Sequence, residues 1–289
     1  MGRLIVNADD FGLTPGVNRA VRELHGAGVL TSATLMARAR ATQEALDFAA
    51  HTPSLGVGCH IVLTDGDPVL PPSQIPSLID AKTGRLTITL GQFLLRLFSG
   101  RIRAEEIEAE AAAQIAVLQH AGLRLTHIDT HKHTHMFPAL LRPVLRAARA
   151  AGIAAIRNPF EPVWAVHATP RAPWLRRAEE TALRRFEPAL HRIIAQEGFA
   201  TTDGTVAVVG TGTLDAAMVR SLVRQLPAGT WELVTHPGYN DADLAQVRTR
   251  LRASREIEMH ALEALREFPH LELASFAALP TSPAPATVS

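Results

Sequence analysis

The chain has 289 residues, of which 47% are hydrophobic and 20% charged. This length and composition allow a large buried core, so we expect one large domain. The formal net charge is +1, from 29 basic and 28 acidic side chains, so no overall basic field favours a nucleic-acid partner. The single cysteine, Cys59, excludes an internal disulfide and a cysteine-based zinc site, and it suits a reducing compartment.

The sequence carries no recognisable targeting or membrane-spanning segment. Residues 1–6 lead directly into a strand-like segment, without the basic and apolar regions of a secretion signal. No stretch has the roughly 18 consecutive apolar residues that a transmembrane helix needs. We therefore expect a soluble, cytoplasmic protein that could still contact a membrane at its surface.

Strand-like and helix-like segments alternate along the chain. The predicted strands are residues 4–8, 32–36, 56–63, 125–129, 205–209, 231–235 and 271–276. The predicted helices are residues 16–28, 41–50, 92–99, 104–122, 138–152, 214–226 and 243–268. This alternation predicts an α/β fold with a mostly parallel sheet, either open or closed into a barrel.

Three segments interrupt the alternation. Residues 65–85 are rich in Pro, Gly and Asp and are predicted to form a long loop over one end of the sheet. Residues 159–199 carry two tryptophans and several arginines, and we expect an inserted helical segment there (Trp164, Trp174, Arg171, Arg176, Arg177, Arg184, Arg185). Residues 280–289 are predicted to be a disordered tail, which leaves residues 1–279 as a single domain.

Two adjacent carboxylates, Asp9 and Asp10, end the first predicted strand. Catalytic groups gather at strand carboxyl ends in parallel α/β folds. Neighbouring residues on a strand point to opposite faces, so both can serve one site only if the chain turns there, and Gly12 makes such a turn plausible. The alternative is that one Asp merely caps the following helix.

Histidines occur at the ends of three further strands. His60 lies within an apolar strand, where a lone histidine is more often a hydrogen-bonded core residue than a ligand. The segment His127-Ile-Asp129-Thr-His131-Lys-His133-Thr-His135 places five polar side chains on one face for as long as it stays extended. A strand rises ~3.3 Å per residue, so the five cannot all bind one ion, and the rest would contact ligands or substrate. A solvent-exposed histidine-rich loop is the alternative.

A fourth strand ends in His236-Pro-Gly-Tyr239. His236 can act as a general acid or base because an unperturbed imidazole titrates near neutrality, or it can simply bond to the backbone of a loop. The later Arg255-Glu256-Ile257-Glu258 is predicted to be a solvated helix face with ion pairs.

Asp and His at four strand ends indicate a hydrolytic metal site. One carboxylate and two imidazoles leave positions on a divalent ion open to water and substrate. Such an ion lowers the pKa of bound water, a free carboxylate accepts its proton, and a His opposite protonates the leaving group. A two-metal phosphoesterase is a rival, but the chain has no obvious set of bridging carboxylates.

Taken together, these motifs resemble the YdjC-like carbohydrate deacetylase family, from Asn7-Ala-Asp-Asp-Phe-Gly through His60 and the histidine-rich segment to His236-Pro-Gly. The resemblance implies an irregular (β/α) barrel, similar to a TIM barrel, and one divalent metal ion, Mg²⁺ first and Zn²⁺ or Mn²⁺ otherwise. It implies Asp10, His60 and His131 as ligands, Asp9 as general base and His236 as general acid. Which of Asp9 and Asp10 is base and which is ligand stays open. We expect the other candidates to contact substrate (His127, Asp129, His133, His135, Tyr239).

The implied reaction is removal of the N-acetyl group from an acetamido sugar. Segment 159–199 makes the chain more similar to the hopanoid-biosynthesis branch of the family, whose substrate would be an N-acetylglucosaminyl hopanoid lipid. That reading implies peripheral membrane contact through this segment. Deacetylation of soluble oligosaccharides and a non-catalytic metal-binding regulatory module are the alternatives, and a homodimer is compatible with the barrel.

Overall fold

The computed structural model describes residues 2–87, 89–169, 172 and 174–280. Of the predicted tail, 280–289, only Pro280 is among them. The strands are β1 (Arg3–Phe11), β2 (Ser32–Leu35), β3 (Gly56–Ile61), β4 (Ile128–Thr130), β5 (Gly204–Val206), β6 (Thr230–Thr235) and β7 (Glu272–Ala274). The first helices are α1 (Pro15–Gly26), α2 (Thr42–Ala50), α3 (Leu90–Phe98), α4 (Ala104–His120) and α5 (Pro138–Ala150). The later ones are α6 (Val163–Ala168), α7 (Trp174–Leu183), α8 (Glu187–Gln196), α9 (Ala216–Arg224), α10 (Ala242–Ala245) and α11 (Ala253–Ala261). Four 3-10 turns complete the fold: η1 (His131–Met136), η2 (Arg184–Phe186), η3 (Leu262–Glu267) and η4 (Phe276–Ala278).

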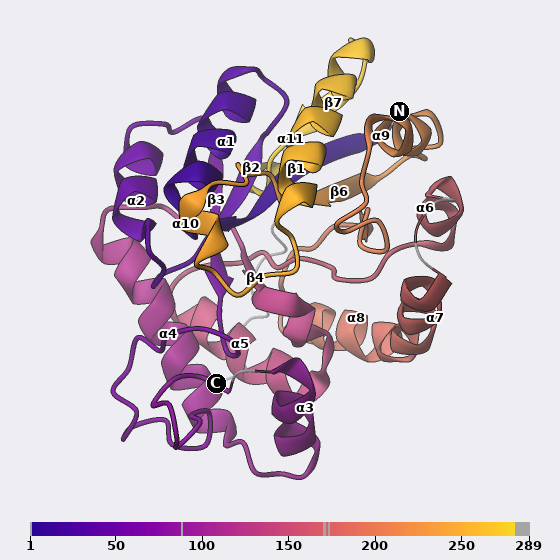
Figure 1. Ribbon diagram of the computed structural model, residues 1–289. Coiled ribbons are helices and arrows are strands. Elements are labelled where there is room, and N and C mark those ends of the chain that lie inside the picture. The colour runs from indigo at the N-terminus through magenta and orange to yellow at the C-terminus, as the bar shows by residue number, and fades with distance from the viewer. Residues whose placement is uncertain (1, 88, 170–171, 173, 281–289) are drawn as a thin grey trace.

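The sheet is parallel and curled. Its strand order is β4-β3-β2-β1-β6-β5, and β7 pairs with the first residues of β1. Single parallel bridges, Ile128 to Ile156 and Ala155 to Ala200, link β4 to the segment leading into β5, so the strands form an irregular ring. Figure 1 shows the helices arranged around this ring. The predicted α/β fold with an irregular, barrel-like sheet is confirmed.

Strands of this barrel are buried on both faces. In β1 every residue after Arg3 is buried, because helices cover the outer face and side chains of other strands fill the interior. The interior is polar near the carboxyl ends of the strands, where Asn7, Asp9 and Thr34 are joined by hydrogen bonds. The fold thus collects buried polar groups at one end of the barrel.

Two predicted elements differ from the structure. The helix expected over 243–268 is broken into α10, α11 and η3, and residues 246–252 are not helical. Arg252 donates to the carbonyl of Ala245 over 2.9 Å and so satisfies a carbonyl at the end of α10. The strand expected over 125–129 is β4, and the chain leaves the extended conformation at His131. The loop predicted over 65–85 is confirmed, with an isolated bridge between Ile79 and Leu86 at its end.

Segment 159–199 contains α6, α7, η2 and α8. Trp164 packs edge-on against Trp231, with ring centroids 5.3 Å apart, whereas Trp174 is 78% exposed. Arg171, one of the arginines of this segment, lies outside the described residues. No helix in the described part of the chain is long and apolar enough to cross a bilayer.

Candidate metal centre

Asp9 and Asp10 reach the same end of the barrel because β1 is irregular there. The pairing of β1 with β2 shifts register between Ala8 and Phe11, and Asp10 has a left-handed φ of 61°. The expected turn is therefore present: it begins at Asp10 and includes Gly12, which has a positive φ of 92°. Thr14 caps α1 by accepting the N–H of Val17, so the helix-capping interpretation of the aspartates is wrong.

Asp10, His60 and His131 form a compact donor cluster. Oδ1 of Asp10 lies 3.5 Å from Nε2 of His60 and 3.4 Å from Nδ1 of His131, and the two nitrogens are 3.2 Å apart. Ligand atoms that sit 2.0–2.2 Å from one ion lie about 2.9–3.5 Å from each other, so these residues fit a single divalent ion. The Asp10 and His60 side chains are 6% and 1% exposed and that of His131 is 23% exposed, which leaves the cluster accessible on the His131 side.

Two buried partners orient these donors. Oδ1 of Asp129 lies 2.8 Å from Nδ1 of His60, which fixes a proton on Nδ1 and leaves Nε2 free to face the cluster. Burial opposes a charged His60, but Asp129 outweighs it and raises the pKa of His60 to about 9. Arg255 donates to Oδ2 of Asp10 over 2.5 Å. Although burial raises the pKa of Asp10, the Arg255 charge holds it well below its usual range.

The Arg157 guanidinium pairs with three buried carboxylates close to the cluster. It is fully buried and pairs with Asp9 at 2.6 Å, Asp129 at 2.5 Å and Glu232 at 2.5 Å. Burial works against a charged Asp9, but the Arg157 guanidinium outweighs it and holds the pKa of Asp9 far below its usual range. The pKa of Glu232 is raised to about 7, chiefly by burial.

A second group of donors, Asp9, His60 and Asp129, also lies within reach of one point. Asp9 and Asp129 already share the Arg157 guanidinium, so a cation there would have to displace a buried positive charge. The cluster of Asp10, His60 and His131 is therefore the better metal site.

His236 lies next to Asp9. Its Nε2 is 3.8 Å from Oδ2 of Asp9, and its Nδ1 is 3.6 Å from Oε2 of Glu258, which also accepts the backbone N–H of His236. Burial alone lowers the pKa of His236, but Glu258 outweighs it and the pKa is raised. Arg255 and Glu258 are each 1% exposed, so the prediction of a solvated face over 255–258 is wrong for these two residues.

The other residues, which were predicted to contact substrate, do not all lie at the cluster. His127 is fully buried, stacks on Phe276 with ring centroids 3.7 Å apart, and packs against Gly58, where a Cβ atom would lie 2.5 Å from its ring. Tyr239 donates to Glu23 on α1 over 2.5 Å and lies beneath the guanidinium of Arg19.

His133 and His135 follow a turn that carries them away from the extended arrangement. His135 is fully buried between Thr130 and the carbonyl of Arg157, and burial lowers its pKa to about 4. His133 has a buried Nδ1 with no hydrogen-bond partner among the described residues, and burial lowers its pKa to about 3. Of the five alternate residues, the structure brings Asp129 and His131 to the cluster.

Three site residues were missed: Arg157, Arg255 and Glu258. Arg157 pairs with Asp9 across 148 positions, and Arg255 with Asp10 across 245 positions. In the sequence, the only sign that these residues belong to the site is that each is a charged residue within or beside an apolar segment. Such residues are common on surfaces, and so the signal does not separate them from exposed arginines.

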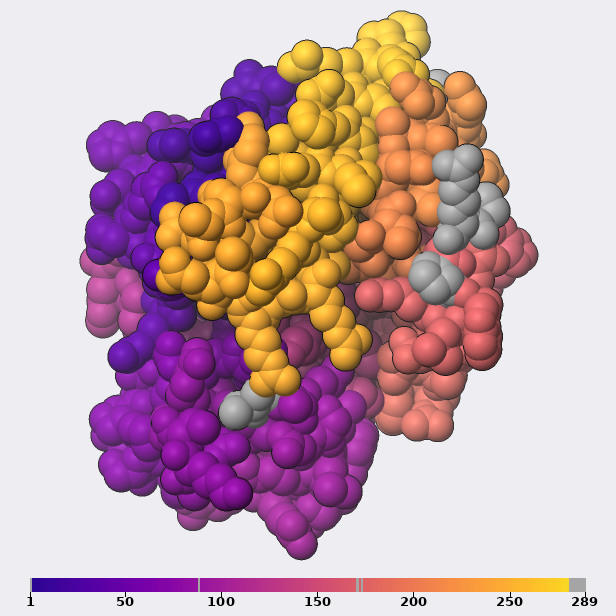
Figure 2. All heavy atoms as spheres, viewed as in Figure 1, coloured from indigo at the N-terminus to yellow at the C-terminus, as the bar shows by residue number. Residues whose placement is uncertain are grey.

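A cavity of about 510 Å³ opens at the carboxyl ends of β1, β2 and β3. Leu13, Met36 and Val247 form part of its apolar wall, and its rim is charged, mostly with arginines (Arg38, Arg40, Arg85, Arg248, Asp65, Asp67). Figure 2 shows the surface hollowed between the orange segment that follows β6 and the purple and magenta segments. This size is within the range of ligand sites, so the cavity can accommodate a substrate at the end of the barrel that carries the cluster.

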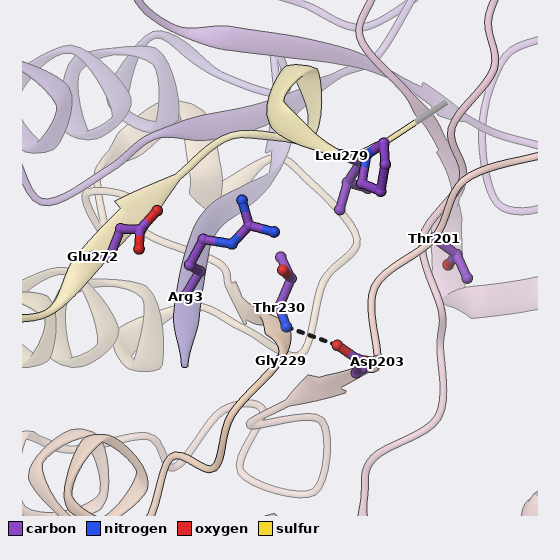
Figure 3. Close-up of a pocket in the computed structure, with 8 residues that line it drawn as sticks. Arg3, Thr201, Asp203, Gly229, Thr230, Glu272 and Leu279 are labelled. Atoms are coloured by element: carbon purple, nitrogen blue, oxygen red, sulfur yellow. Dashed lines mark hydrogen bonds between the residues drawn. The ribbon is translucent and has the colours of Figure 1, made fainter. Parts of the chain in front are cut away.

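Another cavity, of about 440 Å³, lies at the opposite end of the barrel (Figure 3). Arg3, Thr230 and Glu272, which begin β1, β6 and β7, line it, and Asp203 accepts the N–H of Thr230 over 2.7 Å. The amino ends of barrel strands serve stability more than catalysis, so we place the site at the other end.

Comparison with known proteins identifies the family. The family model described as YdjC-like protein matches residues 3–268. A carbohydrate deacetylase of Brevibacillus brevis is 34% identical over 96% of this chain and 99% of its own. A chitooligosaccharide deacetylase of Salmonella paratyphi B is 39% identical over 52% of this chain and 57% of its own. A crystal structure from Enterococcus faecalis, provisionally named a cellobiose-phosphate cleavage protein, is 26% identical with a TM-score of 0.73 and covers 95% of this chain and 97% of its own. The chain therefore belongs to the YdjC-like family.

Proposed function

We propose that this protein is a metal-dependent deacetylase that removes the N-acetyl group from an acetamido sugar. The observation that carries the proposal is the cluster of Asp10, His60 and His131, which has the donor spacing of a metal site and lies beside Asp9 and His236. Membership of a family whose relatives are named carbohydrate and chitooligosaccharide deacetylases supports it. Residues 1–279 would act as one domain.

Asp10, His60 and His131 would hold one divalent ion, with Mg²⁺ first and Zn²⁺ or Mn²⁺ as alternatives, since oxygen and imidazole donors suit all three. When bound, the ion polarises the amide carbonyl and lowers the pKa of the attacking water. Asp129 holds the His60 ring through Nδ1, which would leave Nε2 for the ion, and Arg255 holds the Asp10 carboxylate in place.

Asp9 would accept the water proton and His236 would donate a proton to the departing amine nitrogen. Asp9 is ionised, because the Arg157 guanidinium holds its pKa below the usual range, and the same pairing makes it a weaker base than an ordinary carboxylate. His236 is protonated more readily than an ordinary histidine because Glu258 raises its pKa. Nε2 of His236 and Oδ2 of Asp9 lie 3.8 Å apart, so the reacting amide would have to lie beside this pair, within reach of both atoms, and not between them. Products would be acetate and the free amino sugar.

We further propose that the acetamido sugar is carried by a hopanoid lipid and that segment 159–199 contacts the inner face of the membrane. Exposed apolar side chains on this segment support this, with Val163 54%, Trp174 78% and Leu175 55% exposed. Arg176 and Arg185 in the same segment could contact anionic headgroups. Leu95 and Phe98 on α3, 69% and 61% exposed, provide an apolar surface that a homodimer would bury.

Soluble N-acetylated oligosaccharides are the second candidate substrate. The observation in their favour is the charged, arginine-rich rim of the 510 Å³ cavity, which offers hydrogen-bond partners for sugar hydroxyls. A non-catalytic metal-binding module is the candidate from another class, and it requires only the metal site.

The test is acetate release by the metal-loaded protein from N-acetylglucosaminyl lipid and from N-acetylglucosamine oligomers, with Asp10→Ala and His131→Ala as controls. Release from the lipid alone, lost in both variants, supports the hopanoid substrate. Release from the oligomers supports the second candidate and contradicts the lipid assignment. Metal binding without release from either substrate contradicts the deacetylase and favours the non-catalytic module. Asp9→Asn should bind metal normally but release acetate at a greatly reduced rate.

A further inference from the structure

An ion pair joins the two loops that follow β3 and β4. Nζ of Lys132 lies 2.8 Å from Oδ2 of Asp65, and the two side chains are 30% and 18% exposed. Asp65 is anchored in turn, since its N–H donates to the carbonyl of Thr87 over 2.9 Å. β3 carries His60 and the loop after β4 carries His131, so the pair connects the segments that provide two of the three candidate metal ligands.

The loop that carries His131 has an unfavourable backbone. Lys132 has φ 58° and ψ 27°, His133 has φ 52° and ψ 30°, and Asp65 has φ 61°. Left-handed conformations cost free energy for residues with a side chain, and they persist where surrounding contacts enforce them. Two consecutive left-handed residues therefore need contacts on both sides of the turn.

The contacts on the carboxyl side of the turn are buried. Oγ1 of Thr130 accepts the N–H of His135 at 2.9 Å and lies 2.8 Å from its Nδ1. Nε2 of His135 faces the carbonyl of Arg157 at 3.1 Å. On the other side of the turn, the described contact of the Lys132 side chain is its ion pair with Asp65. His131 begins this turn, so its ring direction depends on both anchors.

Lysine is rare in this chain. Only two of its 29 basic residues are lysines, Lys82 and Lys132. Lys82 is exposed on the surface and lies outside the site, so it provides a matched control. A partly exposed ion pair contributes little to the free energy of unfolding of the whole protein. We therefore expect this pair to act mainly on the local conformation of the turn.

We propose that Lys132 and Asp65 are positioning residues that hold the strained turn so that Nδ1 of His131 faces Asp10 and His60. This inference rests on the proposed metal site. The Lys132 and Asp65 side chains would act through His131, because neither contacts the ion or the reacting atoms. Breaking the pair lets the turn relax toward ordinary backbone angles, which moves His131 away from the other two donors.

The test is Mn²⁺ affinity by titration calorimetry on the full chain, with thermal unfolding recorded for each variant. Lys132→Met and Asp65→Asn should each weaken Mn²⁺ binding by about 2- to 5-fold, the most that a partly exposed ion pair can contribute to holding the turn. The double variant should bind no more weakly than the weaker single variant, because both changes break one contact. Lys132→Arg keeps the charge and should restore most of the affinity, and Lys82→Met should match the wild type.

Three outcomes overturn the proposal. The first is unchanged Mn²⁺ affinity in Lys132→Met, and the second is a lower unfolding temperature with unchanged affinity, which indicates a purely structural contact. The third is a wild-type protein that binds no Mn²⁺, which removes the metal site itself. If the wild type binds Mn²⁺ but releases no acetate, the deacetylase proposal fails while the affinity comparison still decides this inference. At saturating Mn²⁺, acetate release by Lys132→Met should recover, because the turn affects occupancy and not the reacting groups.

Discussion

Arg255 and Asp10 are 245 positions apart in the chain, yet Nη2 of Arg255 donates to Oδ2 of Asp10 over 2.5 Å. Arg255 is 1% exposed and lies on α11, which the break after α10 allows to approach the barrel end. The arginine occupies one carboxylate oxygen, and the other oxygen faces His60 and His131. The last quarter of the chain thus orients a donor provided by the first ten residues.

Replacing Arg255 with Met should weaken metal binding. The Asp10 carboxylate would lose the contact that orients it, and groups of this kind typically contribute 10–100-fold to affinity, so we expect a loss of about that size. Mn²⁺ calorimetry measures the effect, and Arg220→Met, which removes an exposed pair with Glu267, is the control. Equal affinity in Arg255→Met and wild type would show that Arg255 does not orient Asp10.

Asp129→Asn should disturb the proton position on His60. An amide cannot hold Nδ1–H as a carboxylate does, so both tautomers become populated and Nε2 carries a proton part of the time. Above the His60 pKa of about 9, where the imidazole is neutral, ¹⁵N NMR should show the Nδ1–H tautomer in wild type and a mixture in the variant, and acetate release should fall by about 10–100-fold. Asp47→Asn, on the surface of α2, is the matched change. A single unchanged tautomer in Asp129→Asn would contradict the role of Asp129.

The pH profile should report His236. If the protonated imidazole is the acid, kcat/KM falls as pH rises through its pKa, which is raised above that of an ordinary histidine because Glu258 outweighs burial. Glu258→Gln removes that charge, so the alkaline limb should move to lower pH. Glu263→Gln, in an exposed pair with His260, should leave the limb in place. Superimposable profiles for Glu258→Gln and wild type would count against His236 as the acid.

Arg157→Met should destabilise the fold more at neutral than at acid pH. The change leaves Asp9, Asp129 and Glu232 buried without their countercharge, at a cost of about 3–5 kcal/mol. Without Arg157, burial raises the pKa of these carboxyls above the unfolded values, so the variant is relatively more stable below those values and loses stability as pH rises. Urea unfolding at pH 7 and pH 5 measures this, with Arg220→Met as control. A loss that does not shrink at pH 5 would contradict the charge argument.

Much of the fold could be predicted from local pattern. Alternating apolar segments predicted the parallel sheet, and the strand ends predicted Asp9, Asp10, His60, His131 and His236 at one end of it. These inferences needed only the rule that parallel strands share a carboxyl end. The helix over 243–268 failed because periodicity does not reveal a break that a tertiary contact, Arg255 to Asp10, stabilises.

The histidine-rich segment shows the limit within the site. Period-two spacing put His127 through His135 on one face, but the left-handed residues Lys132 and His133 end the extended chain after Thr130. Neither residue is a glycine, so the sequence gives no local warning of the turn. The pairing of Arg157 with Asp9 and that of Arg255 with Asp10 are equally invisible, because these partners lie 148 and 245 positions apart in the chain.

The most direct test of the account is anomalous diffraction from crystals of the full chain grown with Mn²⁺. The account predicts one anomalous peak about 2.0–2.3 Å from Oδ1 of Asp10, Nε2 of His60 and Nδ1 of His131, a peak that is lost in His131→Ala. A peak between Asp9 and Asp129 in place of this one, or acetate release by crystals with no peak at these residues, would contradict it.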